Sequence, residues 1–575
     1  MSTHHFPKRW GAEPQEDGRW RFAIWAPDAA EVAVEIERAI TPLLGSDDGW
    51  LVGSAVAEAG CTYSFRIDGA TYPDPAARAQ ASDVHGPSRL VDPRAFSWSG
   101  GWQGIPWHQA VIYELHVGTF TPEGTLAAAQ RELARLKGLG ITLIELMPLA
   151  QFDGARGWGY DGVLLYAPHE SYGGADALKQ FVDAAHKLGI GVLLDVVYNH
   201  FGPSGNYLPA WCPSFFHASV RSPWGQGIAF DEPAVRSFFV DNALYWLEEY
   251  QLDGLRLDAV HAIADQTTED FLDELGQAVR ARDWGRPIHL VTEDERNLAD
   301  YLQAHAPFDA SWNDDWHHAI HCLLTGETES YYATFAVDPL ADIETALRDG
   351  YVEQGQSRPP HDRPRGKPSS ALPRTAFINF LGNHDQVGNR AQGERLHHLT
   401  EDMNALRVVT ALTLLTPFTP MLFMGDEFLT HAPFLFFTDF SGDLAEAVRV
   451  GRAREFETFS AFSGTVPDPN APETAARSVV GSARTEPQRA HEAFVRDILA
   501  LRAFHIVPLL AETQRPVAIV QRDGAVFDAT WRFETVALHL RFVLGGEGFS
   551  LPVDPFFVEA PAGSRFAFAA AVRKA

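Results

Sequence analysis

The stretch DGLRLDAV, residues 253–260, places two carboxylates and one arginine inside a run of apolar residues. Side chains of a β-strand alternate between its two faces, so Arg256 and Asp258 point to the same side. A buried charge is unfavourable unless it is paired. The stretch therefore predicts a buried strand with a fixed Arg–Asp pair, which is either structural or part of a reactive site.

Seven further apolar runs resemble this one, and amphipathic stretches separate them. They are AVIYELHVG (110–118), ITLIELMPL (141–149), GVLLDVVYNH (191–200), IHLVTED (288–294), FDASWND (308–314), TAFINFLGNHD (375–385) and TPMLFMGDE (419–427). Strands that are apolar on both faces suit a parallel sheet covered by helices. Eight strand-then-helix units predict an α/β fold with a (β/α)8 TIM barrel. A doubly wound sheet is the alternative, but no Gly-rich dinucleotide loop follows the first strand.

Short alternating runs precede and follow the barrel pattern. RWRFAIWAP and EVAVEIE lie near the start, and GAVFDATWRF and TVALHLRFVL lie near the end. Such runs predict strands, so we expect a β-sandwich on each side of the barrel. The predicted domains are an N-terminal, carbohydrate-binding-like sandwich (1–92), a catalytic barrel (93–512) and a C-terminal sandwich (513–575). The Pro-rich, polar stretch 353–374 predicts a long loop.

Composition excludes several classes of partner. The 575 residues carry a formal net charge of −29, from 46 basic and 75 acidic residues. This charge disfavours nucleic acid and anionic membranes as partners. The chain starts without the apolar core of a signal peptide, and it has no run of about 18 apolar residues. Its three cysteines fit neither a disulfide framework nor a zinc site. We expect a soluble, cytoplasmic protein.

Polar residues gather at the ends of the predicted barrel strands. Strand three ends in Asn199 and His200, strand four in Asp258, strand five in Glu293, and strand seven in His384 and Asp385. A single histidine there is typical of a structural residue, and a single aspartate of a helix cap. Active sites of such barrels lie at the carboxyl ends of the strands. The coincidence of these groups on one rim therefore predicts a catalytic site.

Three carboxylates without a cysteine or lysine indicate acetal chemistry. Glycoside hydrolysis needs one carboxylate and one carboxylic acid beside the bond that breaks. Arg256 would favour the charged form of Asp258, which could then act as the nucleophile. Glu293 would be the proton donor, and Asp385 would hold two sugar hydroxyls. Metal binding by these acids is a weaker interpretation, because Arg256 and the histidines would repel a cation. We therefore predict no metal and no cofactor.

Four segments resemble the signature regions of the alpha-amylase superfamily of glycoside hydrolases. DVVYNH, GLRLDAV, TED and NHD match in order and on the expected strands. The resemblance implies a retaining mechanism with Asp258 as nucleophile, Glu293 as general acid/base and Asp385 as transition-state stabiliser. It also implies that four further residues contact the sugar at the cleavage point: Tyr160, in GWGYDGVLLYAP, and His200, Arg256 and His384.

Other segments narrow the choice within the superfamily. YELHVGTFTPEGT, DVVYNHFGPSGNYL and PFLFFTDF are similar to those of trehalose-releasing members. The similarity implies a malto-oligosyltrehalose substrate, cleaved at the α-1,4 bond next to its terminal trehalose, and a malto-oligosyltrehalose synthase acting earlier. A 1,4-α-glucan branching enzyme is the alternative, since it shares YELHVG and GWGY. A non-catalytic carbohydrate-binding protein is a third hypothesis, disfavoured because all three acids are present.

Two aromatic residues are candidates to receive the trehalose unit. Trp224 lies in RSPWGQGIAF and Tyr331 in TGETESYYATF. For each residue, packing in the protein interior is as good an interpretation as sugar binding. A sugar site pairs aromatic faces with a few fixed polar groups. The calcium site of amylases lies in a long insert after strand three. Here the corresponding loop, about 200–230, is short and poor in acids, so we predict no structural calcium.

Overall fold

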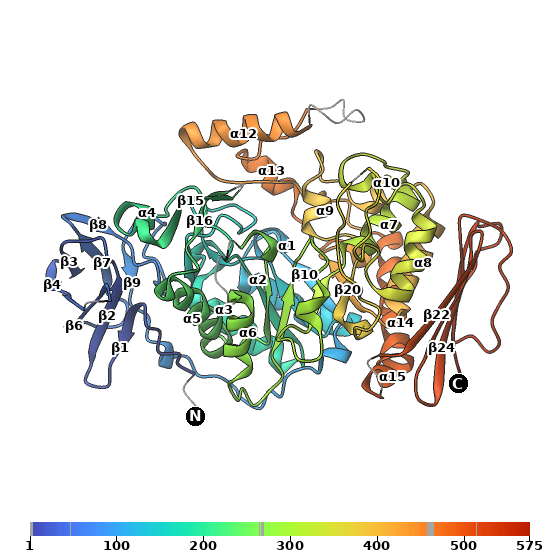
Figure 1. Ribbon diagram of the computed structural model, residues 1–575, viewed down its shortest axis with the longest axis horizontal. Coiled ribbons are helices and arrows are strands. Elements are labelled where there is room, and N and C mark those ends of the chain that lie inside the picture. Colours follow the sequence, from blue (N-terminus) through green and yellow to red (C-terminus); the bar gives the residue numbers. More distant parts are fainter. Residues whose placement is uncertain are drawn as a thin grey trace.

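A computed structural model describes residues 4–46, 48–222, 224–263, 265, 270–360, 362–456, 465–512 and 515–574. Its centre is a closed barrel of parallel strands (Figure 1). In order around the barrel they are β10 (Ile112–Leu115), β11 (Leu143–Leu146), β14 (Gly191–Val196), β17 (Gly254–Leu257), β18 (His289–Thr292), β19 (Ala310–Trp312), β20 (Phe377–Asn379) and β21 (Thr419–Phe423). Each of the eight predicted runs contains one of these strands, so the predicted barrel is confirmed.

The barrel interior contains a buried apolar cluster, and buried polar side chains lie beside it. Ile112, Leu143, Leu193 and Val291 belong to this cluster. Gly254 begins β17, and a Cβ there would lie 2.1 Å from the His289 carbonyl oxygen, so only glycine lets the two strands approach. The preceding Asp253 is fully buried and accepts hydrogen bonds from the side chains of Trp102 and His186. Asp253 therefore belongs to the structure at the amino end of the strand.

Helices cover the outside of the barrel. They include α2 (Leu126–Leu139), α3 (Gly174–Lys187), α5 (Pro233–Glu249), α6 (Phe271–Arg280), α7 (Asp314–Thr325) and α8 (Pro339–Asp349). In α3, buried side chains recur three or four positions apart, as expected for a helix with one face on a sheet. Within the described part of the chain, no helix combines the length and apolar character that crossing a membrane requires.

The N-terminal region is a sandwich of two sheets, as predicted. One sheet has the order β1 (Gly11–Pro14), β2 (Arg19–Trp25), β6 (Trp50–Val56) and β5 (Leu44–Gly45). The other contains β4 (Ala39–Pro42), β3 (Val32–Ile36), β7 (Thr62–Ile67) and β8 (Ala70–Tyr72). The alternating burial of β3 reflects one face turned to the other sheet and one to solvent.

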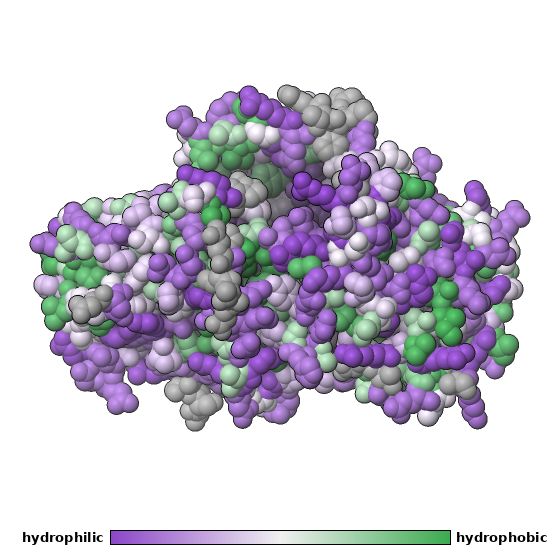
Figure 2. All heavy atoms as spheres, in the orientation of Figure 1, coloured by the Kyte–Doolittle hydropathy of each residue, from purple (hydrophilic) through white to green (hydrophobic). Residues whose placement is uncertain are grey.

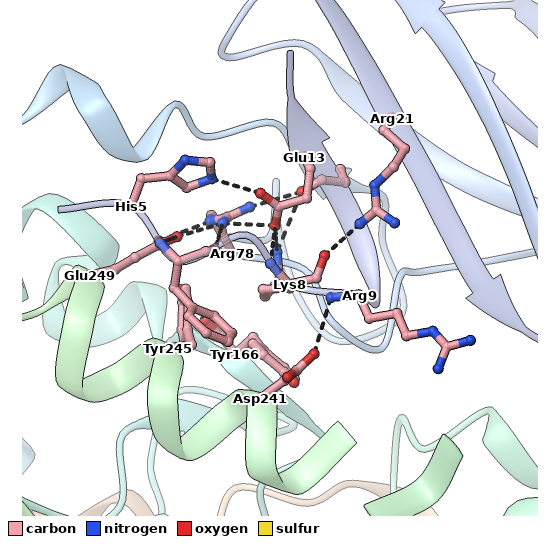
Figure 3. A network of polar contacts seen from close by, with 12 residues as sticks. His5, Lys8, Arg9, Glu13, Arg21, Arg78, Tyr166, Asp241, Tyr245 and Glu249 are labelled. Atoms are coloured by element: carbon pink, nitrogen blue, oxygen red, sulfur yellow. Dashed lines mark hydrogen bonds and ion pairs between the residues drawn. The ribbon is translucent and has the colours of Figure 1, made fainter. Parts of the chain in front are cut away.

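A buried cluster of charges joins this sandwich to α5 of the barrel (Figure 3). The Arg78 guanidinium donates to both oxygens of Glu249, at 2.9 Å and 2.5 Å, and lies 2.9 Å from Glu13. The Lys8 ammonium donates to Glu13 at 2.8 Å. Burial acts to raise the pKa of Glu13, but the Arg78 and Lys8 charges lower it well below its usual value. Two cations and two carboxylates thus form a closed, paired group.

The C-terminal region differs from the prediction, because it forms one sheet where two packed sheets were expected. Its strands run in the order β22 (Val517–Asp523), β23 (Val526–Arg532), β24 (Val536–Leu544), β26 (Phe566–Lys574) and β25 (Phe557–Glu559). The helices α8 and α11 (Met403–Leu415) pack against this sheet. They cover its apolar side, so a second sheet is not required there. The exact boundaries between the three predicted domains stay a prediction.

Several segments that follow strand ends lie on one side of the barrel (Figure 1). They include the short helix α9 (His384–Gly388), the hairpin β15 (Phe216–Ser222) and β16 (Gly225–Ile228), and the projecting helix α12 (Gly442–Phe456). Figure 2 shows the surface hollowed beneath α12. The described part of 353–374 has no helix or strand before Arg374, as predicted, and Arg365 ties it to Asp315 at 2.6 Å.

Candidate active site

One buried arginine organises the acids at the carboxyl ends of β14, β17 and β18. Arg256 has no exposed surface, and one of its terminal nitrogens donates to Asp195 at 2.6 Å and to Asp258 at 2.9 Å. Its other terminal nitrogen donates to Glu293 at 2.6 Å. Its guanidinium carbon also lies 4.0 Å from the centre of the Trp312 ring. Arg256 is therefore the centre of a cluster in which three acids accept its hydrogen bonds.

Asp258 follows directly after β17 and is held on both carboxylate oxygens. Arg256 donates to one oxygen, and the side-chain amide of Asn199 donates to the other at 3.0 Å. The side chain still has an exposed fraction of 10%. A carboxylate bound through both oxygens has a fixed orientation, and this one remains accessible from the rim.

Glu293 follows directly after β18 and is kept as an acid. Burial raises its pKa well above the usual value, Arg256 acts against this, and the Asp258 and Asp385 charges reinforce it. The Glu293 oxygen that accepts from Arg256 also accepts from the backbone N–H of Ala259, at 2.9 Å. Ala259 has a left-handed backbone with a φ of 39°, a strained conformation for alanine. Strain of this kind is typical of functional sites.

Asp385 lies on α9 beside an imidazole. The distance from His384 Nε2 to Asp385 Oδ1 is 3.4 Å, and Asn389 donates to the same oxygen at 3.4 Å. Burial acts to raise the pKa of Asp385, but the His384 charge and hydrogen bond lower it below the usual value. Glu293 and Asp385 are thus neighbouring acids whose pKa values are shifted in opposite directions. Such divergence separates a proton donor from an ionised group.

Aromatic side chains surround these acids. The Tyr160 hydroxyl donates to Asp195 at 2.6 Å, and its ring stacks on the His384 ring at 5.0 Å between centroids. His200 is buried and stacks on Trp224 at 4.6 Å, nearly parallel. The structure therefore brings five of the six predicted sugar-site residues together with the three predicted acids, and the sixth, Tyr331, lies farther out.

Trp224 and Tyr331 are both exposed at the surface. Their exposed fractions are 48% and 43%, so neither is a core aromatic. Tyr331 lies against Tyr332 and against His318 of α7, with ring centroids 4.5 Å and 5.2 Å away. Each ring keeps part of its surface exposed, which a stacking surface requires.

Sequence reasoning did not identify three polar residues of this region as site residues. They are Glu114 on β10, Asp195 on β14 and Asp314 at the start of α7, whose carboxylate accepts from Gln386 at 2.9 Å. Burial and the Asp385 charge raise the pKa of Asp314 to about 6. A usable signal existed for Glu114 and Asp195, because each is a lone acid inside an apolar strand.

Metal binding has no support among the described residues, where no group of three or more His, Cys, Asp or Glu side chains could hold an ion. The acids of the rim are already bound to Arg256 or lie beside His384. The arrangement places Glu293, whose pKa is raised well above the usual value, next to Asp258, which is held on both oxygens. That combination suits bond cleavage by an acid and a nucleophile.

Comparison with known proteins identifies the family. Residues 72–210 match the alpha-amylase catalytic domain family. Malto-oligosyltrehalose trehalohydrolase of Deinococcus radiodurans is 43% identical over 537 residues, covering 92% of this chain and 88% of that protein. This chain belongs to the malto-oligosyltrehalose trehalohydrolase family. It is a glycoside hydrolase with the alpha-amylase fold, which confirms the resemblance found in the sequence.

Two further similarities bear on fold and on the alternative function. A 1.4 Å crystal structure from Salmonella typhimurium, solved as a candidate alpha amylase, has a TM-score of 0.94 and 45% identity, and the match covers 99% of this chain and 100% of that one. A 1,4-alpha-glucan branching enzyme of Jannaschia is 33% identical over 318 residues, only 48% of this chain and 43% of that enzyme. The similarity to the branching enzyme is therefore partial.

Proposed function

We propose that this protein hydrolyses the α-1,4 bond next to the terminal trehalose of malto-oligosyltrehalose and so releases trehalose. The observation that carries the proposal is that one buried guanidinium, Arg256, binds both Asp258 and Glu293 in a chain of the trehalohydrolase family. The two acids are thereby fixed within reach of one bond.

In the first step, Asp258 attacks the anomeric carbon of the sugar that lies against Tyr160. The bond from that carbon to the bridging oxygen breaks, and its electron pair goes to the oxygen. Glu293 gives this oxygen its proton, because burial and two neighbouring carboxylates keep the side chain protonated. Trehalose leaves, and the glucan stays bound to Asp258 as an ester.

In the second step, water completes the hydrolysis. Glu293, now ionised, takes a proton from a water molecule, and the oxygen of that water attacks the anomeric carbon and releases Asp258. Asp385 holds sugar hydroxyls throughout, in keeping with its lowered pKa, and His200 and His384 lie at the same sugar, whereas the fully buried Arg256 acts on it only through Asp258 and Glu293. Two displacements give retention, so proton NMR of the first turnovers is expected to show the α-anomer at the new reducing end.

The trehalose unit is proposed to lie against Trp224, which stacks on His200, and against Tyr331 farther out, because both rings are exposed. Trp224→Ala and Tyr331→Ala are each expected to lower the preference for a trehalose-ended over a plain substrate by about tenfold, since a small apolar contact in a specificity pocket is worth about 1–3 kcal/mol. Measuring kcat/KM for both substrates tests this. A preference unchanged in both variants would remove these residues from the trehalose site.

The substrate has a 1,1-linked end that maltodextrin lacks. An isomerase that converts the reducing-end linkage of maltodextrin, a malto-oligosyltrehalose synthase, is therefore proposed to act before this enzyme. A cytoplasmic location is likewise proposed, from composition and cysteine content alone.

Product analysis tests the function as a whole. The purified protein is incubated with malto-oligosyltrehalose and, separately, with malto-oligosaccharide of equal length. Free trehalose from the first and slow turnover of the second are expected. New α-1,6 branches in a longer glucan without trehalose release would instead establish the branching alternative. If the folded protein formed neither trehalose nor branches, both proposed functions would be contradicted.

A further inference from the structure

Glu114 lies in the barrel interior and binds the residue beside Asp385 twice. It has an exposed fraction of 1% and belongs to β10, far in sequence from α9. One of its carboxylate oxygens accepts from the backbone N–H of His384 at 3.1 Å, and the other lies 2.5 Å from Nδ1 of the same residue. A carboxylate accepts hydrogen bonds only, so Nδ1 carries a hydrogen in this arrangement.

The opposite edge of the His384 ring faces Asp385, and its flat face is covered by Tyr160. Burial acts to lower the pKa of His384, yet the Asp385 and Glu114 charges raise it well above the usual value. The other titratable groups facing this ring are His116, which follows β10, and Glu145 on β11. The ring is thus an imidazolium between two carboxylates, one in the barrel interior and one at the rim.

We propose that Glu114 is a positioning residue, which fixes the orientation and the double protonation of His384 and so keeps a cation opposite Asp385. The proposal deepens the proposed function, on which it rests for the role of Asp385. Without the negative charge of Glu114, burial favours the neutral imidazole. A neutral ring that keeps its hydrogen on Nδ1 turns a lone pair toward Asp385, so the carboxylate loses its counter-ion.

Glu145 provides a matched control next to Glu114. The two residues are opposite each other in the β10–β11 register, and each has an exposed fraction of 1%. Neither oxygen of Glu145 has a hydrogen-bond partner among the described residues. Burial and the Glu114 charge raise its pKa well above the usual value, so this side chain is a neutral acid. Replacing it with glutamine changes little, whereas the same change at Glu114 removes a charge.

Two readouts on the full chain test the proposal. The first is the ¹⁵N NMR titration of His384, assigned by the signal that disappears in His384→Asn. The imidazolium is expected to persist through pH 8 in the unmodified protein and in Glu145→Gln. In Glu114→Gln it is expected to lose its proton at least about one pH unit earlier. The second readout is the pH profile of kcat, expected to fall about 10–100-fold in Glu114→Gln, with the largest loss at alkaline pH.

The outcomes separate this proposal from the proposed function. A neutral His384 at pH 7 in the unmodified protein would overturn the proposal even if Glu114→Gln did not fold. So would a Glu114→Gln protein whose His384 titration and kcat equal those of Glu145→Gln. The titration needs no substrate, so a protein that released no trehalose would count against the proposed function and leave this test intact. Glu114→Asp, which keeps the charge, is expected to restore the imidazolium.

Discussion

Two buried ionic clusters in this protein contain similar groups and differ in their balance of charge. At the junction of sandwich and barrel, Lys8 and Arg78 face Glu13 and Glu249 (Figure 3). In the candidate active site, Arg256 alone faces three carboxylates. The junction lowers the pKa of Glu13, whereas the site raises that of Glu293, although each lies beside an arginine. The ratio of cations to carboxylates therefore decides whether a buried acid is fixed as an ion or kept as a proton donor.

The largest effect is expected at Asp258. Asp258→Asn removes the proposed nucleophile and should lower kcat by about 10⁴-fold or more while leaving substrate binding intact. Asp253→Asn, at the other end of the same strand, is the control. It weakens hydrogen bonds to Trp102 and His186 and should reduce thermal stability but not the kcat of the folded enzyme. Near-normal kcat in Asp258→Asn would contradict the assignment.

Substitution of Glu293 tests whether the acid whose pKa is raised by neighbouring carboxylates is the proton donor. Glu293→Gln should lower kcat by about 10²–10⁴-fold and remove the alkaline limb of the pH profile. Catalysis needs Glu293 in its protonated form. Because its pKa is raised, this form persists to higher pH, and its loss there produces the alkaline limb. Glu295→Gln, an exposed neighbour, should leave both kcat and the limb unchanged. An alkaline limb that survives in Glu293→Gln would assign the limb to another group.

Substitutions in the cluster between sandwich and barrel should change the stability of the protein and leave its kcat unchanged. Arg78→Met leaves Glu13 and Glu249 buried without their shared cation, and we expect a loss of about 3–5 kcal/mol. Arg9→Met removes an exposed ion pair with Asp48 and should leave the melting temperature nearly unchanged. Thermal unfolding and kcat at 25 °C measure the two effects separately. An unchanged melting temperature in Arg78→Met would show that the closed cluster does not hold the junction.

Local patterns predicted the parts of this molecule that local physics determines. Asp258 and Glu293 could be found because each directly follows an apolar strand of a barrel, and the ends of parallel strands meet at one rim. The partners of those acids could not be found in this way. The bonds from Glu114 to His384 and from Arg78 to Glu249 span 270 and 171 residues. Such contacts depend on how strands and domains come together, which no local spacing encodes.

The C-terminal sheet shows the same limit at a larger scale. The apolar positions of β23 and β24 predicted strands correctly, because their alternation is local. The alternation says only that one face must be covered. It does not say whether a second sheet or helices such as α8 and α11 provide the cover.

The smallest expected effect is a difference between the two clusters in how the melting temperature depends on pH. Glu13 has a lowered pKa, so its ionised form stabilises the fold above the ordinary glutamate pKa, and this contribution is lost as the pH falls through the folded-state pKa. The melting temperature of Glu13→Gln should therefore lie below that of the unmodified protein at pH 7 and approach it below about pH 4.

Glu293 should show the opposite sign. Its raised pKa means that ionisation opposes folding as the pH rises above the ordinary glutamate pKa, so Glu293→Gln should be as stable as the unmodified protein at about pH 3 and more stable at pH 9. Melting temperatures from pH 3 to 9 for both variants measure this. If the melting temperatures of both variants shifted in the same direction relative to the unmodified protein across that range, charge balance would not distinguish the two clusters. Opposite signs would mean that one chain uses the same types of buried residue for stability at the junction and for reactivity at the rim.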